Sequence, residues 1–246
     1  MPAIAAIRTP ERGRSDARLR PLEDVHVLAV DLDSERPDLR MLSEDERGRA
    51  SGFRFERDRH RFVAARCVLR RRLAQYLDAS PRELRFEYGP QGKPSLRGCD
   101  LSFNASHSGR AGLFAFASGF DLGVDVELLA HARPDDDRVA ERFFSRREVR
   151  TLQACAPAVR AHAFLRCWTR KEAFIKGRGE GLTLPLQDFD VEFAAGEPPA
   201  LLRTAWSPTE PAEWTLCDLS EPASGAVAAL AARAPEIRVI RCAENI

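Results

Sequence analysis

The stretch that most constrains the fold runs from Ala158 to Lys176 and contains neither glycine nor proline. Both residues interrupt helices, so their absence over this length favours one continuous helix. Apolar residues recur along the stretch at the spacing of a buried helical stripe: Phe164, Leu165, Trp168 and Ile175. This spacing predicts an amphipathic helix, and the following Gly177 is expected to end it.

Two charged residues share one face of that helix. Glu172 and Lys176 are four positions apart, so they lie one turn from each other. The simplest interpretation is a surface ion pair, which contributes only about 0.3–0.5 kcal/mol to stability. The stretch alone favours that interpretation, and a second segment is needed to change it.

That second segment is Gly123–Leu129, which reads Gly-Val-Asp-Val-Glu-Leu-Leu and predicts a strand with Asp125 and Glu127 on one face. Two carboxylates on one face of an apolar strand repel each other and lose hydration, so a cation is expected between them. A lysine or an arginine would serve, but a hard metal ion is the stronger candidate. If the helix packs over this strand, Glu172 becomes a third oxygen ligand.

The composition is that of an ordinary globular chain. Its 246 residues fit one large domain or two small ones, and a hydrophobic fraction of 44% is enough for a core. No apolar run has the length of a signal peptide or a membrane span, so we expect a cytoplasmic protein with residues 1–20 as a flexible leader. The net charge of +1 gives no field that would attract nucleic acid or a membrane. The six cysteines form no Cys-x-x-Cys pair, which argues against a zinc or redox motif.

Arginine replaces lysine almost everywhere in this chain. Of the 38 basic residues only Lys93, Lys171 and Lys176 are lysines, which suggests positions where a compact ammonium is needed. Residues 47–72, by contrast, are rich in arginine. That run has two interpretations: a solvated helix face, which is the commoner case, or an anion site, most simply for phosphate.

The rest of the pattern predicts an α+β chain made of two related halves. Helices are expected at 57–77 and 134–144, and strands at 25–33, 84–88, 111–117, 189–193, 201–206, 214–219, 226–232 and 237–242, the last five in one antiparallel sheet. Residues 102–109 are interpreted as a strand end that runs into a polar loop. Capping boxes at Ser43 with Glu46 and at Ser145 with Glu148 predict two further helix starts.

The order strand, short helix, long helix occurs twice along the chain. This weak repeat predicts two pseudo-symmetric halves, at 21–120 and 121–246, each a small antiparallel sheet packed with a long helix. The carboxylate strand and the Glu172 helix belong to the second half. The active site is expected in the cleft between the halves.

Several separated motifs resemble those of 4′-phosphopantetheinyl transferases. In chain order they are Gly92-Lys93-Pro94, Asn104 to Ser108, Gly123 to Glu127, Arg142 to Ser145 with Glu148, and Trp168 to Lys176. The resemblance is to the large monomeric type that activates non-ribosomal peptide synthetases such as surfactin synthetase. It spans roughly residues 47–193. One departure is Phe62, where some members carry a small hydroxyl residue.

The resemblance implies Mg²⁺-dependent transfer of the 4′-phosphopantetheine arm of coenzyme A to a serine of an apo carrier protein, peptidyl or acyl, with release of adenosine 3′,5′-bisphosphate. It implies Asp125, Glu127 and Glu172 as ligands of Mg²⁺, or of Mn²⁺ in its place. Glu172 is the implied base, acting directly or through a metal-bound water, and Lys176 the group that assists the leaving phosphate. Contacts with coenzyme A are implied for Arg49, Arg54, Arg61, Gly92, Lys93, Pro94, Asn104, Ala105, Ser106, His107, Asp125, Lys171, Glu172 and Lys176.

The resemblance also implies a monomer that docks its carrier near the cleft. The loop after Gly177 and the helix around Phe143–Leu152 are the candidate docking elements. Two other classes of function stay open: a metal-dependent phosphoesterase or nuclease that uses the same carboxylates without coenzyme A, and a non-catalytic coenzyme A-binding protein. The presence of Lys176 and of every carboxylate favours the transferase.

Overall fold

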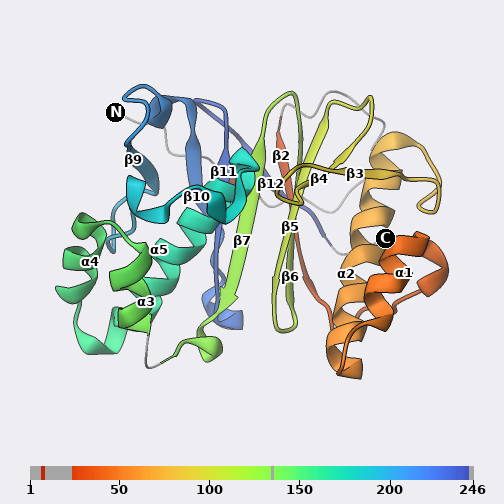
Figure 1. Cartoon of the computed structure of the whole chain (residues 1–246), viewed down its shortest axis with the longest axis horizontal. Coiled ribbons are helices and arrows are strands. Elements are labelled where there is room, and N and C mark those ends of the chain that lie inside the picture. The colour runs from red at the N-terminus through yellow and green to blue at the C-terminus, as the bar shows by residue number, and fades with distance from the viewer. Residues whose placement is uncertain (1–6, 9–23, 134–135, 244–246) are drawn as a thin grey trace.

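The computed structural model describes residues 7–8, 24–133 and 136–243, and it shows two α+β halves whose sheets face each other (Figure 1). The helices are α1 (Glu44–Ser51), α2 (Glu56–Leu77), α3 (Asp136–Phe143), α4 (Arg146–Gln153) and α5 (Pro157–Arg178). The strands are β1 (Ile7–Arg8), β2 (Val25–Asp31), β3 (Phe86–Tyr88), β4 (Pro94–Leu96), β5 (Leu101–Ser108), β6 (Ala111–Ser118), β7 (Leu122–Leu128), β8 (Phe189–Glu192), β9 (Ala200–Thr204), β10 (Thr215–Asp218), β11 (Ala226–Ala232) and β12 (Val239–Arg241). Short 3-10 turns include η2 (Leu129–His131). The predicted α+β class is confirmed.

Two sheets form the centre of the molecule. The larger one has the strand order β1-β12-β2-β6-β5, and the smaller one has the order β10-β11-β7. Two hairpins, β3–β4 and β8–β9, stand apart from them. Strands β5 and β7, which carry the polar motifs, are therefore both edge strands, and they belong to different sheets.

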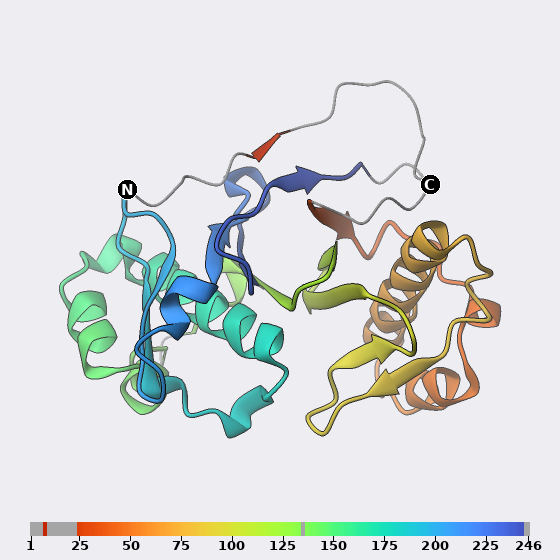
Figure 2. The ribbon, with the colours of Figure 1, turned by 90° about the horizontal axis from the view of Figure 1, so that it is seen from above.

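The layers run helix, sheet, sheet, helix across the molecule (Figure 1). Helix α2 packs on the outer face of the larger sheet, with Leu69, Leu73 and Phe114 in that core. Side chains of both sheets meet in a second core between them, where Val27 and Ala115 pack with Val124. Helix α5 covers the outer face of the smaller sheet, and Figure 2 shows the two long helices on opposite sides of the paired sheets.

Helix α5 packs directly on β7, as the site prediction required. A Cβ atom at Gly123 would lie 2.2 Å from the carbonyl oxygen of Ala173 and 2.3 Å from the amide of Gly177, so no other residue fits at Gly123. The prediction that this helix ends at Gly177 was wrong. The helix continues to Arg178, and the following residue, Gly179, adopts a left-handed conformation with φ 75°. Gly177 lies inside the helix because its missing side chain leaves room for Trp214.

Predictions for three parts of the chain were wrong: two concerned which strands pair, and one placed a strand segment in a loop. The chain segment of β12 was expected in the antiparallel sheet of the second half, yet Val239 pairs in parallel with Val25 of the first half. Strands β8 and β9 form a hairpin of their own. Residues Asn104–Ser108 are not a loop but the continuation of β5, paired with β6 up to Ser108. Strand partners depend on contacts between distant segments, which the local pattern does not contain.

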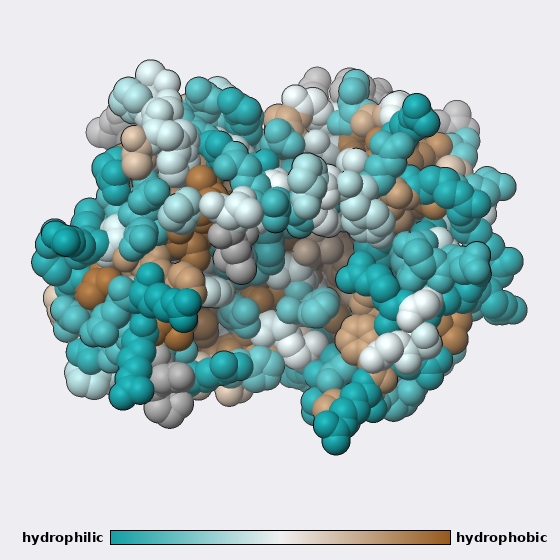
Figure 3. Space-filling view, viewed as in Figure 1, coloured by the Kyte–Doolittle hydropathy of each residue, from teal (hydrophilic) through white to brown (hydrophobic). Residues whose placement is uncertain are grey.

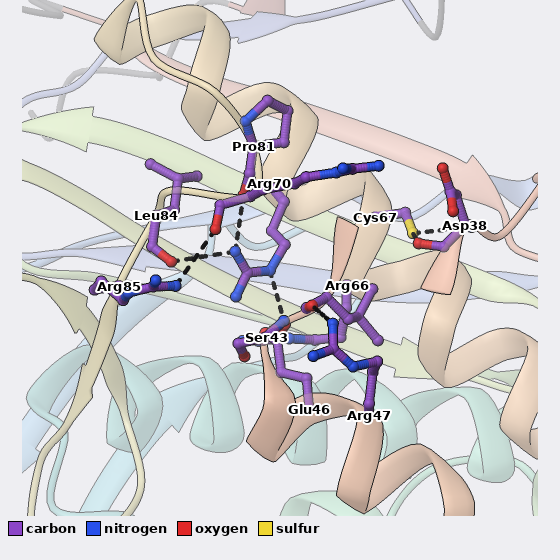
Figure 4. A network of polar contacts seen from close by, with 12 residues as sticks. Asp38, Ser43, Glu46, Arg47, Arg66, Cys67, Arg70, Pro81, Leu84 and Arg85 are labelled. Carbon is purple, nitrogen blue, oxygen red and sulfur yellow. Dashed lines mark hydrogen bonds and ion pairs between the residues drawn. The ribbon is translucent and has the colours of Figure 1, made fainter. Parts of the chain in front are cut away.

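The two capping boxes form as predicted, and each glutamate also holds a cation from the long helix of its half. The carboxylate of Glu46 accepts from the Ser43 amide at 3.0 Å and pairs with Arg70, whose Nη1 donates to the carbonyls of Pro81 and Leu84 (Figure 4). Glu148 repeats this arrangement in the second half, as described below. The order strand, short helix, long helix therefore recurs in space.

The expected leader, residues 1–20, lies outside the described residues except for Ile7–Arg8, which pair with β12. None of the helices in the described part of the chain is long and apolar enough to cross a membrane. The face seen in Figure 3 is largely hydrophilic, and its outline is hollowed at the upper and lower edges, where the two halves meet.

Candidate active site

The candidate site lies at the seam where the edge strand β5 meets the edge strand β7. Alternate residues of β5 point across the seam and bond to β7. Asn104 accepts a hydrogen bond from the Val124 amide at 3.0 Å, Ser106 donates to Asp125 at 2.8 Å, and Ser108 donates to Glu127 at 2.6 Å. Side chains thus replace a backbone ladder, which explains why the motif at 104–108 is polar although it forms a strand.

Asp125 is the most buried carboxylate of the seam. Its side chain is 5% exposed, and its Oδ1 contacts Lys176 Nζ at 2.5 Å as well as Ser106. Its Oδ2 is buried and has no hydrogen-bond partner among the described residues. Burial raises the pKa of Asp125, although Lys176 and Ser106 act in the opposite direction. A buried carboxylate oxygen without a partner is costly, so this position favours a further cation.

Glu127 and Glu172 surround Asp125 with more negative charge. Glu127 follows on the same face of β7, and burial together with the charge of Asp125 raises its pKa. Glu172 projects from α5, and burial raises its pKa to about 7, with Asp125 and Glu127 adding to the effect and Lys176 opposing it. These three carboxylates are therefore electrostatically coupled, as the sequence predicted.

Lys176 is the only cation of the described residues that contacts this cluster through a salt bridge. Besides Asp125, its Nζ lies 3.0 Å from the Ser106 hydroxyl. The simplest interpretation of the sequence was a surface ion pair between Lys176 and Glu172. The structure instead directs Lys176 to Asp125 on the neighbouring strand, so the helix and the strand are joined by a partly buried ion pair.

The residues present fit a divalent metal ion in their chemistry. Carboxylate oxygens are the ligands that Mg²⁺ prefers, and the unpartnered Oδ2 of Asp125 supplies one. Among the described residues, however, no three histidine, cysteine, aspartate or glutamate side chains already converge into a ready-made metal site. The ammonium of Lys176 holds the other oxygen of Asp125 in this arrangement.

The Gly92-Lys93-Pro94 motif forms the β3–β4 hairpin, which reaches across to the end of α5. Gly92 adopts φ 80° in the turn. Lys93 Nζ donates to the carbonyl oxygen of Gly177 at 2.6 Å and lies 3.4 Å from Asp121. The hairpin thus ties the first half to helix α5 of the second, close to the seam.

The arginine-rich run is mostly engaged in internal contacts. Arg61 forms two hydrogen bonds to Asp33, at 2.6 and 2.7 Å, and Arg70 is buried against Glu46. Arg49 and Arg54 differ, because they lie over the rings of Phe62 and Phe55 and no carboxylate of the described residues pairs with them. Of the two interpretations of this run, the local anion site stays a prediction, and Arg49 and Arg54 are the guanidiniums left for it, without an acidic partner among the described residues.

Lys171 was expected to contact coenzyme A, and the structure assigns it another role. It is fully buried, and its Nζ bonds to Glu148 at 2.8 Å and to the carbonyls of Leu186 and Phe189, each at 2.7 Å. An ammonium has three hydrogens, and all of them are used. Lys171 directly precedes Glu172, and adjacent helical positions point about 100° apart, so the two side chains lie on different faces of the helix.

Sequence reasoning did not single out two residues that contact the site. Ser108 lay at the end of a recognised motif but received no role, and His131, on η2, lies 3.1 Å from its hydroxyl. The alternation Asn104, Ser106, Ser108 could have indicated a strand whose polar face meets another polar face. His107 is exposed and lies on the opposite face of β5, together with Ala105.

Comparison with known proteins agrees with this geometry. A family model described as "4′-phosphopantetheinyl transferase, N-terminal" matches residues 36–118, and the model of the "4′-phosphopantetheinyl transferase superfamily" matches residues 121–231. The 4′-phosphopantetheinyl transferase HetI of Nostoc sp. is 36% identical over 85% of this chain and 87% of its own length. Sfp of Bacillus subtilis is 33% identical over 61% of this chain and 66% of its own length. A Synechocystis sp. protein named for the same activity is 37% identical over 58% of this chain and 59% of its own length.

An acidic cluster with a lysine lies at the seam of the two α+β halves, and the two family models and the relatives define the chain as a transferase. The extent of the match to HetI and the two consecutive family models identify which one. The chain belongs to the 4′-phosphopantetheinyl transferase family and is similar to its Sfp-type members.

Proposed function

We propose that this protein transfers the 4′-phosphopantetheine arm of coenzyme A to a serine of an apo carrier protein and releases adenosine 3′,5′-bisphosphate. The observation that carries the proposal is the cluster at the seam, where Asp125, Glu127 and Glu172 surround one lysine. The serine oxygen forms a bond to the β-phosphorus, the bond from that phosphorus to the bridging oxygen breaks, and the serine proton goes to a base.

Glu172 is the proposed base. A general base works best when its pKa lies close to the working pH. In the protein without a metal ion, the pKa of Glu172 is raised to about 7 by burial and by its acidic neighbours, and the charge of a bound metal ion would lower it from there. No hydrogen bond within the described residues engages its carboxylate, so it is free to accept the serine proton. A surface glutamate would be a weaker base by about two pKa units.

Lys176 is proposed to assist the leaving phosphate. Its ammonium already contacts Asp125 Oδ1 and the Ser106 hydroxyl, and about 29% of its side chain is exposed. It can therefore donate to a phosphate oxygen that enters the seam. A compact ammonium that transfers a proton suits this position better than an arginine, which stays charged.

The proposed ligands of the metal are Asp125, Glu127 and Glu172. When bound, Mg²⁺ or Mn²⁺ would neutralise the negative charge that builds on the phosphate oxygens. The unpartnered Oδ2 of Asp125 supports this assignment, as does the burial that raises the pKa of all three carboxylates. Repulsion from Asp125 raises the pKa of Glu127 and of Glu172 further.

Coenzyme A is proposed to extend from the seam towards the first half. Arg49 and Arg54, which have no acidic partner within the described part of the chain, are the candidates for its 3′-phosphate, and Arg61 would have to share its guanidinium with Asp33. The other proposed contacts are in the hairpin, Gly92, Lys93 and Pro94, and on β5, Ala105, Ser106 and His107. Asn104 is 5% exposed and bonded to β7, so we propose that it supports the strand that makes these contacts.

The carrier protein is proposed to dock beside α4, in agreement with the docking element expected from the sequence. An open groove of about 750 Å³ lies there, lined by four arginines, Arg146, Arg147, Arg150 and Arg203, and by three acidic residues, Glu141, Asp188 and Asp190. Arg147 and Arg203 pair with Glu192 and Asp190, so Arg146 and Arg150 are the proposed contacts for an acidic partner. Peptidyl and acyl carriers of peptide or polyketide synthesis are the proposed substrates, acted on in the cytoplasm by a monomer, and the six unpaired cysteines fit that reducing compartment.

The proposal is tested by incubating the protein with coenzyme A, Mg²⁺ and a panel of apo carriers, and measuring the intact mass of each carrier. One phosphopantetheine should be added per carrier, at its serine, and the addition should stop with a chelator or without coenzyme A. A panel in which every carrier keeps its mass, while phosphate or a cleaved nucleic acid appears, would instead support the phosphoesterase or nuclease.

A further inference from the structure

Two serines of β5 hold the two carboxylates of β7 in the same way. Ser106 donates to Asp125 at 2.8 Å, and Ser108 donates to Glu127 at 2.6 Å. Each serine hydroxyl also lies close to a side-chain nitrogen of a third residue. For Ser106 it is Lys176 Nζ at 3.0 Å, which the proposed function already uses, and for Ser108 it is His131 Nδ1 at 3.1 Å, which it does not.

Counting hydrogen bonds at Ser108 fixes the direction of each contact. A hydroxyl has one hydrogen and two lone pairs. The hydrogen goes to Glu127 Oε2, and the Leu128 amide donates to the oxygen at 3.3 Å. The remaining lone pair faces His131, so Nδ1 of this histidine carries a hydrogen and donates it. Ser108 is 6% exposed, so little water can take the place of any of these partners.

The backbone beside Ser108 is shaped to accept the imidazole ring. Gly109 adopts φ 55°, a conformation that favours glycine. A Cβ atom there would lie 2.8 Å from Cε1 of His131 and 3.1 Å from Leu128 Cδ1. The turn between β5 and β6 therefore leaves the space that the ring fills, and η2 brings His131 to it only three positions after β7 ends.

We propose that His131 is a positioning residue for Glu127, acting through Ser108. With both lone pairs occupied, the Ser108 hydroxyl cannot turn its hydrogen away from Glu127. One oxygen of that carboxylate is thereby held, and Oε1 has no hydrogen-bond partner among the described residues. The inference rests on the proposed function, in which Glu127 binds the metal ion.

Groups that orient a metal ligand commonly change metal affinity about 10–100-fold when removed. His131→Ala should therefore weaken Mn²⁺ binding, measured by electron paramagnetic resonance of the free ion, by about tenfold or more. The Mg²⁺ concentration for half-maximal transfer should rise in parallel. The KM for coenzyme A and the melting temperature should not change, because the histidine is exposed and contacts neither the nucleotide nor the core.

Two conservative variants separate positioning from bulk. In His131→Asn the side-chain NH₂ stands where Nδ1 stood, so it should restore Mn²⁺ affinity to within about threefold, whereas His131→Gln carries its NH₂ too far out and should not. His162→Ala, at an exposed position of α5, is the matched control and should behave as wild type.

Each result decides between the two proposals. If wild type binds Mn²⁺ and modifies carriers, and His131→Ala does both equally well, the role of His131 is wrong and the proposed function stands. The positioning role is also wrong if His131→Asn loses as much Mn²⁺ affinity as His131→Ala and both variants lower the melting temperature. If wild type neither binds Mn²⁺ nor transfers the arm, the proposed function fails, and the role of His131 fails with it.

Discussion

The two halves of the molecule treat a similar pair of carboxylates differently, since Ala29–Asp33 resembles Gly123–Glu127 in sequence. In the first half, Asp31 ends β2 and Asp33 follows it, and they lie at the surface and pair with Arg110 at 3.2 Å and with Arg61 at 2.6 Å. In the second half, their counterparts Asp125 and Glu127 are covered by α5 and share one lysine with Glu172. In the first half each carboxylate has an arginine of its own, so the negative charge is compensated. In the second half three carboxylates have one lysine, so part of the negative charge remains uncompensated. Reactivity is therefore expected where the compensation is incomplete.

Both halves also contain the same buried ion-pair arrangement, which we call the frame. A capping-box glutamate holds a cation of the long helix, which in turn holds two carbonyls of the following loop. Glu46 has two arginines, Arg66 and Arg70, whereas Glu148 has only Lys171. Burial would raise the pKa of Glu46, but its two arginines lower it overall, while burial raises the pKa of Glu148 despite the lysine.

The comparison is broken most severely by removing Asp125. Asp125→Ala should reduce transfer to an apo carrier by at least about a hundredfold, because a metal ligand and the partner of Lys176 are lost together. Asp31→Ala is the matched control and should transfer at nearly the wild-type rate. The measurement is the initial rate of carrier mass gain, with circular dichroism to show that both variants fold. Near-normal Mg²⁺-dependent activity in Asp125→Ala would refute the assignment.

The ion pairs of the frame provide the next largest effect. Lys171→Met leaves the buried Glu148 with two backbone amides but no cation, and should lower the free energy of unfolding by about 3–5 kcal/mol. Arg70→Met should cost less, because Glu46 keeps Arg66. Urea unfolding followed by circular dichroism measures both. A larger loss for Arg70→Met than for Lys171→Met would show that the two frames are not equivalent in the way described.

The smallest predicted effect is a gain in stability at the active site. The pKa of Glu172 in the folded protein, about 7, lies above its ordinary value of 4.5, so its ionised form is disfavoured in the fold. Stability is therefore lost as the pH rises from about 4.5 to about 7. With a chelator present at pH 8, Glu172→Gln should raise the melting temperature by about 2–4 °C while transfer is lost.

The pH dependence provides the control for that prediction. At pH 4.5 or below, the difference in melting temperature between Glu172→Gln and wild type should become small, because Glu172 of the folded wild type is then largely protonated. Asp33→Asn should show no gain at pH 8, because the Arg61 hydrogen bond holds the pKa of Asp33 below its ordinary value. An equal gain from both variants would mean that the two halves do not differ in charge compensation.

The core of the site could be predicted from the sequence because local spacing determines it. The alternation that places Asp125 and Glu127 on one face and the i,i+4 spacing of Glu172 and Lys176 are properties of single elements. Gly123 and Gly177 allow those elements to touch, a role that becomes visible only in the packed structure.

The failures have physical reasons as well. Asn104–Ser108 was interpreted as a loop because polar residues usually face water, whereas here they bond to the neighbouring strand. The resemblance implied a coenzyme A contact for Lys171, but adjacent helical positions point about 100° apart, and Lys171 is turned into the core against Glu148. Strand β12 joins the first half because the apolar side chains of Ile237 and Val239 fill the core between the sheets, which no local pattern reveals.

The central claim is that charge remains uncompensated in the second half and not in the first. The most direct measurement is Mn²⁺ binding, by electron paramagnetic resonance, to wild type, Asp125→Asn and Asp31→Asn. The account predicts that Asp125→Asn binds at least about tenfold more weakly and that Asp31→Asn binds as wild type does. Equal binding by Asp125→Asn and wild type, or an equal loss in both variants, would contradict it.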